Sequence, residues 1–387
     1  MKIRTATLWG AVSAVASATA PAAAEEVATV DRLVGHRSTV PAIEGQFADL
    51  FVREKGPASI VSSSDGRAEP GKVVLFVHGG FSPPTVAFDL PFADYSWMNF
   101  LAENGYDVFT MEMTGYGMSS RPMMEDPCNV STAQQEAVLV PAELAETCAP
   151  SYPFQLVSSD SETADIHAVV EFIKELRGVE QVTLIGWSGG GIRTGTYTYR
   201  HQENVDKLII WASSNYDREN PNDPPEALPA PGVPITIQPR ETGELDRWLG
   251  TQTCEDWIEP GVPELAWLLS RERDALGSSW GSGVLRAPVR TYWGWNATNA
   301  GTITVPVLVM VGENDGLMES NLKLFDDLGS SEKAFLALEC GTHYAAWERS
   351  AGAMHAASLE WLESTTLEGA SDGRFRSDRS GAVTPLE

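Results

Sequence analysis

The sequence predicts an α/β fold in which a mostly parallel sheet is flanked by helices and interrupted by an inserted cap. Three observations predict it. Short, fully apolar segments typical of buried strands alternate with segments of helical length. One such strand runs directly into Gly-x-Ser-x-Gly and then into a helix. This alternation stops over residues 214–300 and resumes afterwards, so one large domain with an insertion is expected from the 387 residues.

The first 24 residues are expected to be a signal peptide and not part of the fold. Met1–Arg4 is basic, Thr5–Ala20 is moderately apolar, and Ala22–Ala24 provides the small residues of a cleavage site. The apolar stretch is too short and too rich in Ala, Ser and Thr to hold the chain in a bilayer. We therefore expect export to the periplasm or secretion, without stable membrane insertion.

Residues 25–213 are expected to form the first part of the core. An amphipathic helix is predicted over 160–176 because its apolar residues recur at helical spacing. A long irregular excursion is expected over 118–158. The other elements are strands at 49–53, 73–77, 107–111, 182–187 and 205–211, with helices at about 96–104 and from 189 to about 200.

Residues 214–300 interrupt this order and are expected to form a cap or lid. They are rich in proline and contain six of the twelve tryptophans, with helices expected near 242–250, 262–275 and 283–290. The second part of the core, 301–364, should contain strands at 305–311 and 333–339 and a final helix near 345–362. Residues 365–387 are polar and are expected to be a disordered tail.

The strand, turn and helix around Ser188 carry the strongest functional signal. The apolar strand 182–187 leads into Gly186-Trp187-Ser188-Gly189-Gly190, and a helix follows. Such a turn is strained, and Gly186 and Gly190 leave room for the strand and the helix to approach each other. It exposes the serine hydroxyl as a nucleophile and directs the amide of Gly189 toward the oxyanion that would form there.

A nucleophilic serine needs a base, and the base needs an orienting carboxylate. Asp315 lies in the loop after the apolar strand 305–311, and His343 lies in the loop after the strand 333–339. The order Ser188, Asp315, His343 is the order expected of a catalytic triad on an α/β fold with a Gly-x-Ser-x-Gly turn. Asp315 could instead cap the helix that follows it, in which case Glu313 would be the alternative acid.

The loop after the strand 72–77 reads His78-Gly79-Gly80-Phe81. A loop of this kind supplies the second amide of an oxyanion hole. The sequence leaves open whether Gly80 or Phe81 is the donor. His78 is interpreted as a structural residue that holds the loop.

These motifs together resemble those of the α/β-hydrolase superfamily, of the serine esterase and lipase type with a cap. The resemblance spans about residues 45–365 and includes a turn, Thr114 to Ser119, of the form Gly-x-Gly-x-Ser. Glu112 stands before this turn where relatives usually carry aspartate. The resemblance implies the fold and the triad but is nearly silent on the substrate. Trp187, Tyr116 and Tyr344 are candidates for an apolar substrate pocket, and the cap tryptophans either line that pocket or only attach the cap.

Four cysteines in an exported chain favour two disulfides. Cys128 and Cys148 bracket a short insertion, which makes them the preferred first pair. Cys254 would then be joined to Cys340 and would tie the middle of the chain to the loop of His343. Free thiols are the alternative, and the spacing fits no zinc signature.

The favoured function is an exported serine hydrolase that cleaves a carboxylic ester or lactone through an acyl-enzyme. Metals and organic cofactors are not expected to take part. The net charge of −26, with no basic cluster, argues against nucleic acid as a partner. The alternatives are an amidase or peptidase of the same fold and a non-catalytic binding protein on a hydrolase scaffold.

Overall fold

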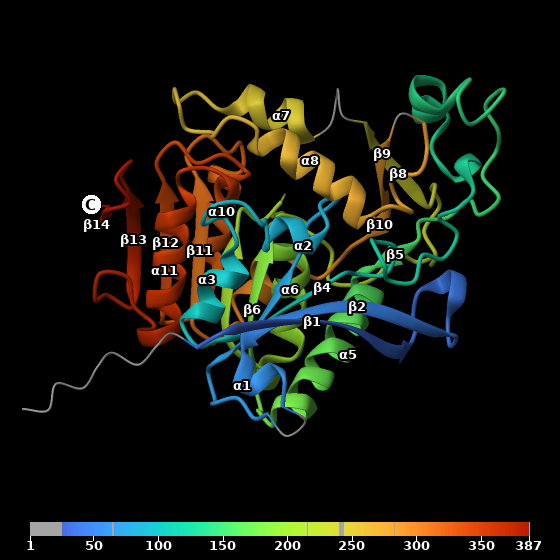
Figure 1. Cartoon of the computed structure of the whole chain (residues 1–387). Coiled ribbons are helices and arrows are strands. Elements are labelled where there is room, and N and C mark those ends of the chain that lie inside the picture. The colour runs from blue at the N-terminus through green and yellow to red at the C-terminus, as the bar shows by residue number, and fades with distance from the viewer. Residues whose placement is uncertain (1–24, 64–65, 215, 240–243, 282, 387) are drawn as a thin grey trace, which may run out of the picture.

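The computed structural model describes residues 25–386, except 64–65, 215, 240–243 and 282 (Figure 1). The predicted signal peptide, 1–24, lies outside the described residues. The main element is a ten-stranded sheet. In spatial order its strands are β1 (Val27–Arg37), β2 (Phe47–Pro57), β4 (Asp107–Met111), β3 (Val73–Val77), β6 (Val182–Trp187), β7 (Val205–Trp211), β11 (Val307–Gly312), β12 (Lys333–Leu338), β13 (Asp372–Ser377) and β14 (Val383–Pro385).

The centre of this sheet is parallel and its edges are antiparallel. The strands from β4 to β13 in this order pair in parallel, while β1–β2, β2–β4 and β13–β14 pair antiparallel. The carboxyl ends of the parallel strands therefore meet along one rim, and loops at that rim can bring distant residues together. The predicted mostly parallel α/β fold is confirmed.

Helices cover both faces of the sheet because each buried strand is apolar on both sides. Val74 and Phe76 of β3 face one core layer, and Val73, Leu75 and Val77 face the other. The first layer lies under α2 (Pro84–Ala87), α3 (Trp97–Glu103) and α11 (Ala351–Ser364). The second lies under α5 (Ser159–Arg177), α6 (Gly189–Arg200) and α10 (Met318–Asp327). Ala300 of α9 (Ala297–Ala300) also packs in the second layer, and α1 (Ala58–Val61) contacts β1 and β2.

The insertion between β7 and β11 lies over the carboxyl ends of the strands (Figure 1). Its helices α7 (Glu244–Thr251) and α8 (Val262–Arg273) lie above the sheet. Its strands β8 (Ile235–Pro239) and β9 (Val284–Pro288) pair antiparallel on either side of these helices in the chain. This strand pair shares a small apolar core with residues of the predicted excursion, such as Met124, Val130 and Leu139.

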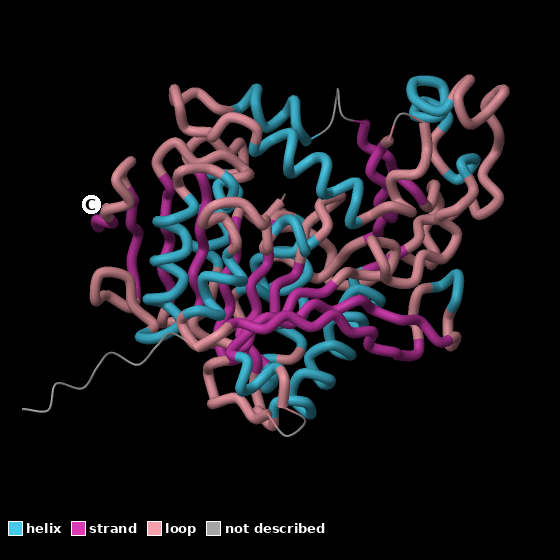
Figure 2. Tube along the Cα trace, in the orientation of Figure 1, coloured by secondary structure: helices cyan, strands magenta, loops and turns pink. Residues whose placement is uncertain are grey.

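The excursion and the insertion together form a side lobe that consists mostly of loop (Figure 2). It contains α4 (Thr132–Gln134) and short helical turns at Pro127–Asn129 and Gln135–Leu139. Within it, the short strand β5 (Val157–Ser158) of the excursion pairs in parallel with β10 (Arg290–Thr291) of the insertion. Further short turns lie at Pro41–Ile43, Gln202–Asn204 and Ala345–Trp347. Among the described helices, none is both long and apolar enough to cross a lipid bilayer.

Two sequence-based expectations are wrong. Residues 365–387 were expected to be disordered, but β13 and β14 extend the sheet. Their polar composition is explained by their place at the sheet edge, where Phe375 packs inward while Arg374 and Arg376 form ion pairs at the surface. A helix was expected over 283–290, but this segment forms β9 and β10. Gly283 and Pro288 stop a helix at either end of it.

Candidate active site

Ser188 occupies a strained turn between β6 and α6. Its backbone angles are φ 55° and ψ −120°, which a residue with a side chain rarely adopts. Hydrogen bonds hold the turn in place: the amide of Ser188 donates to the carbonyl of Trp211 at 3.0 Å, and the carbonyl of Ser188 accepts from Gly191 at 3.0 Å. The strain is thus maintained by the surrounding sheet, and the serine side chain remains partly exposed.

Two glycines permit this turn, as the sequence predicted. A Cβ on Gly190 would lie 2.0 Å from the carbonyl oxygen of Val77 in the neighbouring strand. A Cβ on Gly186 would lie 2.3 Å from Thr194 Oγ1 and 2.5 Å from Gly190 O. Any larger residue at either position would push α6 away from the sheet.

Asp315 follows β11 and His343 follows β12, so both lie at the rim formed by the carboxyl ends of the parallel strands. The distance between His343 Nδ1 and Asp315 Oδ2 is 2.8 Å, and both side chains are buried. A carboxylate only accepts, so Nδ1 carries the proton and Nε2 is left free to act as a base. Glu313, the alternative acid, instead binds Arg376 at 2.5 Å near the surface. The structure therefore brings Asp315, and not Glu313, to the histidine.

Trp187 connects the serine turn to the histidine loop. Its indole Nε1 donates to the carbonyl of His343 at 3.1 Å, and its ring lies 5.5 Å from the imidazole. Trp187 is only 1% exposed and stacks on Trp211. Tyr116 and Tyr344, the other two candidates for the pocket, are also buried. Their part in binding a substrate stays a prediction, whereas their packing role is evident.

The loop after β3 lies against the serine. A Cβ on Gly79 would lie 2.7 Å from Ser188 Cβ and 3.1 Å from Ser188 Oγ, so this position requires glycine. Phe81 has a positive φ of 64°, which turns the loop sharply. The predicted donors Gly80 and Phe81 follow directly in the chain, and the choice between their amides remains open.

His78 holds this loop as a neutral side chain. The amide of Met113 donates to His78 Nε2 at 3.1 Å, so the proton lies on Nδ1, which donates to Gly79 O at 2.7 Å. Burial, and then the nearby cations Arg193 and Arg290, keep the pKa of His78 well below its usual value. This agrees with the structural role that the sequence suggested.

Arg193 is a second residue that holds the loop, and the sequence did not reveal it. Its guanidinium is buried and donates to His78 O at 2.6 Å and to Gly79 O at 3.0 Å. Glu162 of α5 balances its charge at 2.8 Å. These bonds fix the carbonyls of the loop and therefore the direction of the amides that follow. One feature of the sequence could have drawn attention to it: Arg193 lies three residues after Gly190, the last glycine of the Gly-x-Ser-x-Gly motif, on a glycine-rich helix.

Glu112, the departure from the superfamily pattern, has a structural place. Its carboxylate accepts a hydrogen bond from the amide of Met118 at 2.6 Å and closes the Gly-x-Gly-x-Ser turn. Burial raises the pKa of Glu112 to about 7. The turn leaves no space for a side chain at Gly117, because a Cβ there would lie 2.2 Å from this carboxylate.

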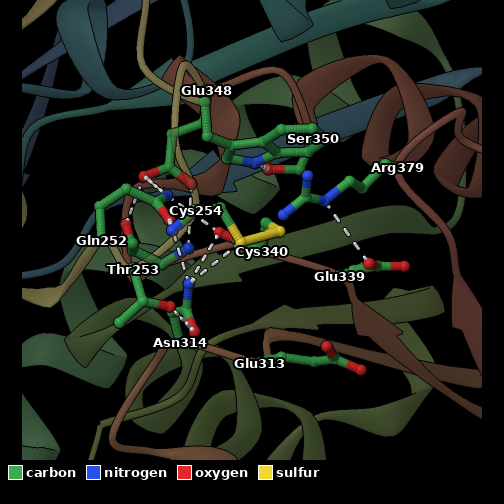
Figure 3. The surroundings of a disulfide bond; sticks show 12 residues. Gln252, Thr253, Cys254, Glu313, Asn314, Glu339, Cys340, Glu348, Ser350 and Arg379 are labelled. Carbon is green, nitrogen blue, oxygen red and sulfur yellow. Dashed lines mark hydrogen bonds and ion pairs between the residues drawn. A yellow bond between two sulfur atoms is a disulfide. The ribbon is translucent and has the colours of Figure 1, made fainter.

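Both disulfides have the predicted pairing, Cys128–Cys148 and Cys254–Cys340. Figure 3 shows that the second one ties the segment after α7 to the loop of the histidine. In the same place Asn314, the neighbour of Asp315, donates to Gln252 Oε1 at 3.1 Å. The segment 252–254 thus contacts both the loop of the acid and the loop of the base.

Glu348 completes this connection and lies above the disulfide in Figure 3. Its buried carboxylate accepts hydrogen bonds from Thr342 N at 2.9 Å and from Trp248 Nε1 of α7 at 2.6 Å. Gln252 Nε2 approaches the same carboxylate at 3.3 Å. Burial raises the pKa of Glu348, although these donors favour its charged form. A single carboxylate therefore joins α7 to the residue before His343.

The inserted helices pack closely on the aromatic side chains next to the histidine. Between α7, α8, Tyr344 and Trp347 the remaining space is about 10 Å³, roughly the volume that one water centre needs. Trp248 and Trp267 fill this contact. These tryptophans hold the insertion on the core. A much larger hollow of about 940 Å³ lies near Tyr95, Arg349 and His355, and none of the three candidate catalytic residues lines it.

Comparison with known proteins agrees with this architecture. The family model of the α/β hydrolase fold matches residues 72–350. Comparison with curated proteins finds no match. Among solved structures, a thermophilic esterase from Thermogutta terrifontis has 15% identity and a TM-score of 0.50, covering 86% of this chain and 98% of its own. The naproxen esterase (carboxylesterase NP) from Bacillus subtilis has 13% identity and a TM-score of 0.49, covering 88% and 93%.

Proposed function

The chain belongs to the α/β-hydrolase family, and on this basis we propose that it is a serine hydrolase that cleaves a carboxylic ester or lactone. The observation that carries the proposal is the 2.8 Å contact between His343 Nδ1 and Asp315 Oδ2 at the rim where Ser188 occupies its strained turn. Asp315 orients the imidazole, so that Nε2 can take the proton of the serine hydroxyl.

In the first half of the proposed reaction, Ser188 Oγ attacks the carbonyl carbon of the ester while its proton moves to His343 Nε2. The carbonyl oxygen becomes an oxyanion and accepts from the amide of Gly189 and from Gly80 or Phe81. The bond to the alcohol then breaks, and the alcohol leaves with the proton from the imidazolium. Ser188 is left as an acyl ester.

In the second half, water attacks the acyl-enzyme and gives its proton to His343 Nε2. The second tetrahedral intermediate collapses, and Ser188 Oγ recovers the proton as it leaves. The products are an acid and an alcohol, or one hydroxy acid from a lactone. No metal or organic cofactor takes part in these steps.

We also propose that residues 214–300 act as a cap and that the protein works after export. The insertion lies over the strand ends that carry the candidate triad (Figure 1). Two disulfides suit an oxidising compartment, and the signal-like residues 1–24 provide a route to it.

A panel of chromogenic substrates tests the reaction class. We expect 4-nitrophenyl esters and small lactones to be hydrolysed, and the matching 4-nitroanilide to be cleaved far more slowly. A fluorophosphonate probe should label the protein, with the adduct on Ser188 by peptide mass spectrometry. Comparable rates on the anilide would favour an amidase, and absence of labelling would favour a non-catalytic binding protein.

Removing the disulfide next to the histidine should impair catalysis as well as stability. In Cys254→Ser/Cys340→Ser the segment after α7 is no longer joined to the histidine loop, so we expect kcat to fall by about 10-fold, because small displacements of catalytic groups are costly. Closing a loop of 86 residues also contributes on the order of 4 kcal/mol to stability in the chain-entropy model. Ester kinetics and thermal unfolding measure the two effects separately.

Cys128→Ser/Cys148→Ser is the matched control. This pair closes a loop of 20 residues in the side lobe, away from the histidine. It should lower the melting temperature while kcat stays within about a factor of two. Equal effects of both double variants on kcat would show that the second disulfide does not position the site.

A further inference from the structure

Arg290 reaches the candidate active site from the insertion. It lies on β10, which pairs with β5, so its backbone is fixed against the start of α5. Its guanidinium lies directly beside Gly189, the residue after the serine: a Cβ on Gly189 would be 3.0 Å from one terminal nitrogen and 3.1 Å from the other. The guanidinium thus takes the space that a side chain at position 189 would fill.

The hydrogen-bonding capacity of this guanidinium is largely unused. Within the described part of the chain its one ion-pair partner is Glu162, and that contact is long at 3.9 Å. Glu162 is already bound by Arg193 at 2.8 Å. Two cations therefore share one carboxylate near the turn of Ser188. The cation that is free to bind a further acceptor is Arg290, whose side chain is 22% exposed.

Any ligand group that Arg290 holds lies close to the reacting carbonyl. Gly189 is next to Ser188, and its amide is the proposed donor to the oxyanion. A guanidinium presents a planar fork of donors, which matches a carboxylate in bidentate geometry. The oxyanion itself exists only briefly and is provided for by backbone amides, so an anion carried by the substrate is the better complement to a resting cation.

We propose that Arg290 is a specificity residue and that the substrate is an ester bearing a carboxylate a few atoms from the scissile carbonyl. This proposal rests on the proposed hydrolase function and names its substrate class. This substrate class differs from the apolar substrate that the tryptophan-rich insertion suggested. Trp248 and Trp267 of the insertion pack against the core, whereas Arg290 of the insertion places a guanidinium beside Gly189.

Paired substrates test the proposal. 4-Nitrophenyl hydrogen glutarate carries a carboxylate where 4-nitrophenyl pentanoate, with the same chain length, carries a methyl group. We expect the wild-type kcat/KM to be higher for the glutarate ester. In Arg290→Met it should fall about 10- to 100-fold for that ester, mainly through KM, as loss of a charge-assisted bond predicts. The pentanoate ester should change less than about 3-fold.

Two further variants sharpen the test. Arg290→Lys keeps the charge but loses the fork, so it should recover part of the preference. Arg200→Met is the matched control. Arg200 is the last residue of α6, far from Ser188, and its side chain has a similar exposure of 21% and a single acidic partner, Asp160 of α5. It should leave both substrates unaffected.

Three outcomes would overturn the proposal: a wild-type enzyme without preference for the glutarate ester, an equal loss on both esters in Arg290→Met, or no loss on either. The equal loss would assign Arg290 to the oxyanion. Binding of glutarate to Ser188→Ala by calorimetry gives a readout without turnover, and it should weaken when Arg290→Met is added. Inactivity on all esters with retained glutarate binding would contradict the hydrolase function and leave the anion site in place.

Discussion

Replacing Ser188 by alanine is expected to lower kcat for ester hydrolysis by several orders of magnitude, on the order of 10⁶-fold if it behaves as other triad nucleophiles do. The change removes the oxygen that would form the acyl-enzyme, and the neighbouring residues offer no second hydroxyl in the strained turn. Stopped-flow and steady-state assays with a 4-nitrophenyl ester measure the loss of kcat. Labelling by the fluorophosphonate probe should disappear with the activity.

The fold of this variant should be unchanged, because the turn is held by backbone hydrogen bonds of residue 188 that alanine also forms. Its melting temperature and its circular dichroism spectrum are the controls. A variant that keeps more than about a tenth of the wild-type rate would show that the nucleophile lies elsewhere, since triad serines contribute far more than this.

Loss of the histidine should be almost as severe. We expect His343→Ala to abolish detectable turnover and Asp315→Asn to reduce kcat by up to about 10⁴-fold. The NH2 group of an asparagine can donate to Nδ1, which stabilises the wrong tautomer of the imidazole, with the proton on Nε2. The aspartate orients the base without exchanging protons, which explains the smaller loss. The same ester assay measures both variants.

Glu313→Gln is the matched control for the acid. Glu313 lies two residues from Asp315 but is bound to Arg376 at the surface. Its substitution should leave kcat within about a factor of two and cost at most about 1 kcal/mol of stability, the range of an exposed ion pair. A silent Asp315→Asn together with an inactive Glu313→Gln would reverse the assignment of the acid.

The sequence predicted those parts of the site that depend on local order. Ser188 is recognisable because strand, glycine, serine, glycine and helix follow within a few residues. Asp315 and His343 are recognisable because each follows an apolar strand, and parallel strands end at one rim. The disulfide pairing followed from the short loop between Cys128 and Cys148.

What the sequence did not predict depends on contacts between distant segments. Arg193 reaches the loop after β3 from α6, and Arg290 lies beside Gly189 because β10 passes the start of α6. No spacing in the chain reveals either contact. The strand β13, second from the sheet edge, was expected to be part of a disordered tail, because its charged side chains find partners such as Asp326 and Glu313 only in the folded sheet. The segment 284–288 is a strand because β8 pairs with it.

The two outer strands have a consequence for the behaviour of the protein in solution. An open sheet edge can recruit strands from other chains, and proteins block this with charges, short strands and proline. On one side β1 carries Asp31 and Arg32, which form ion pairs with Arg53 and Glu54 of β2. On the other side β14 is only three residues long and ends at Pro385. Both borders of the sheet are therefore poor templates for aggregation by edge-to-edge pairing.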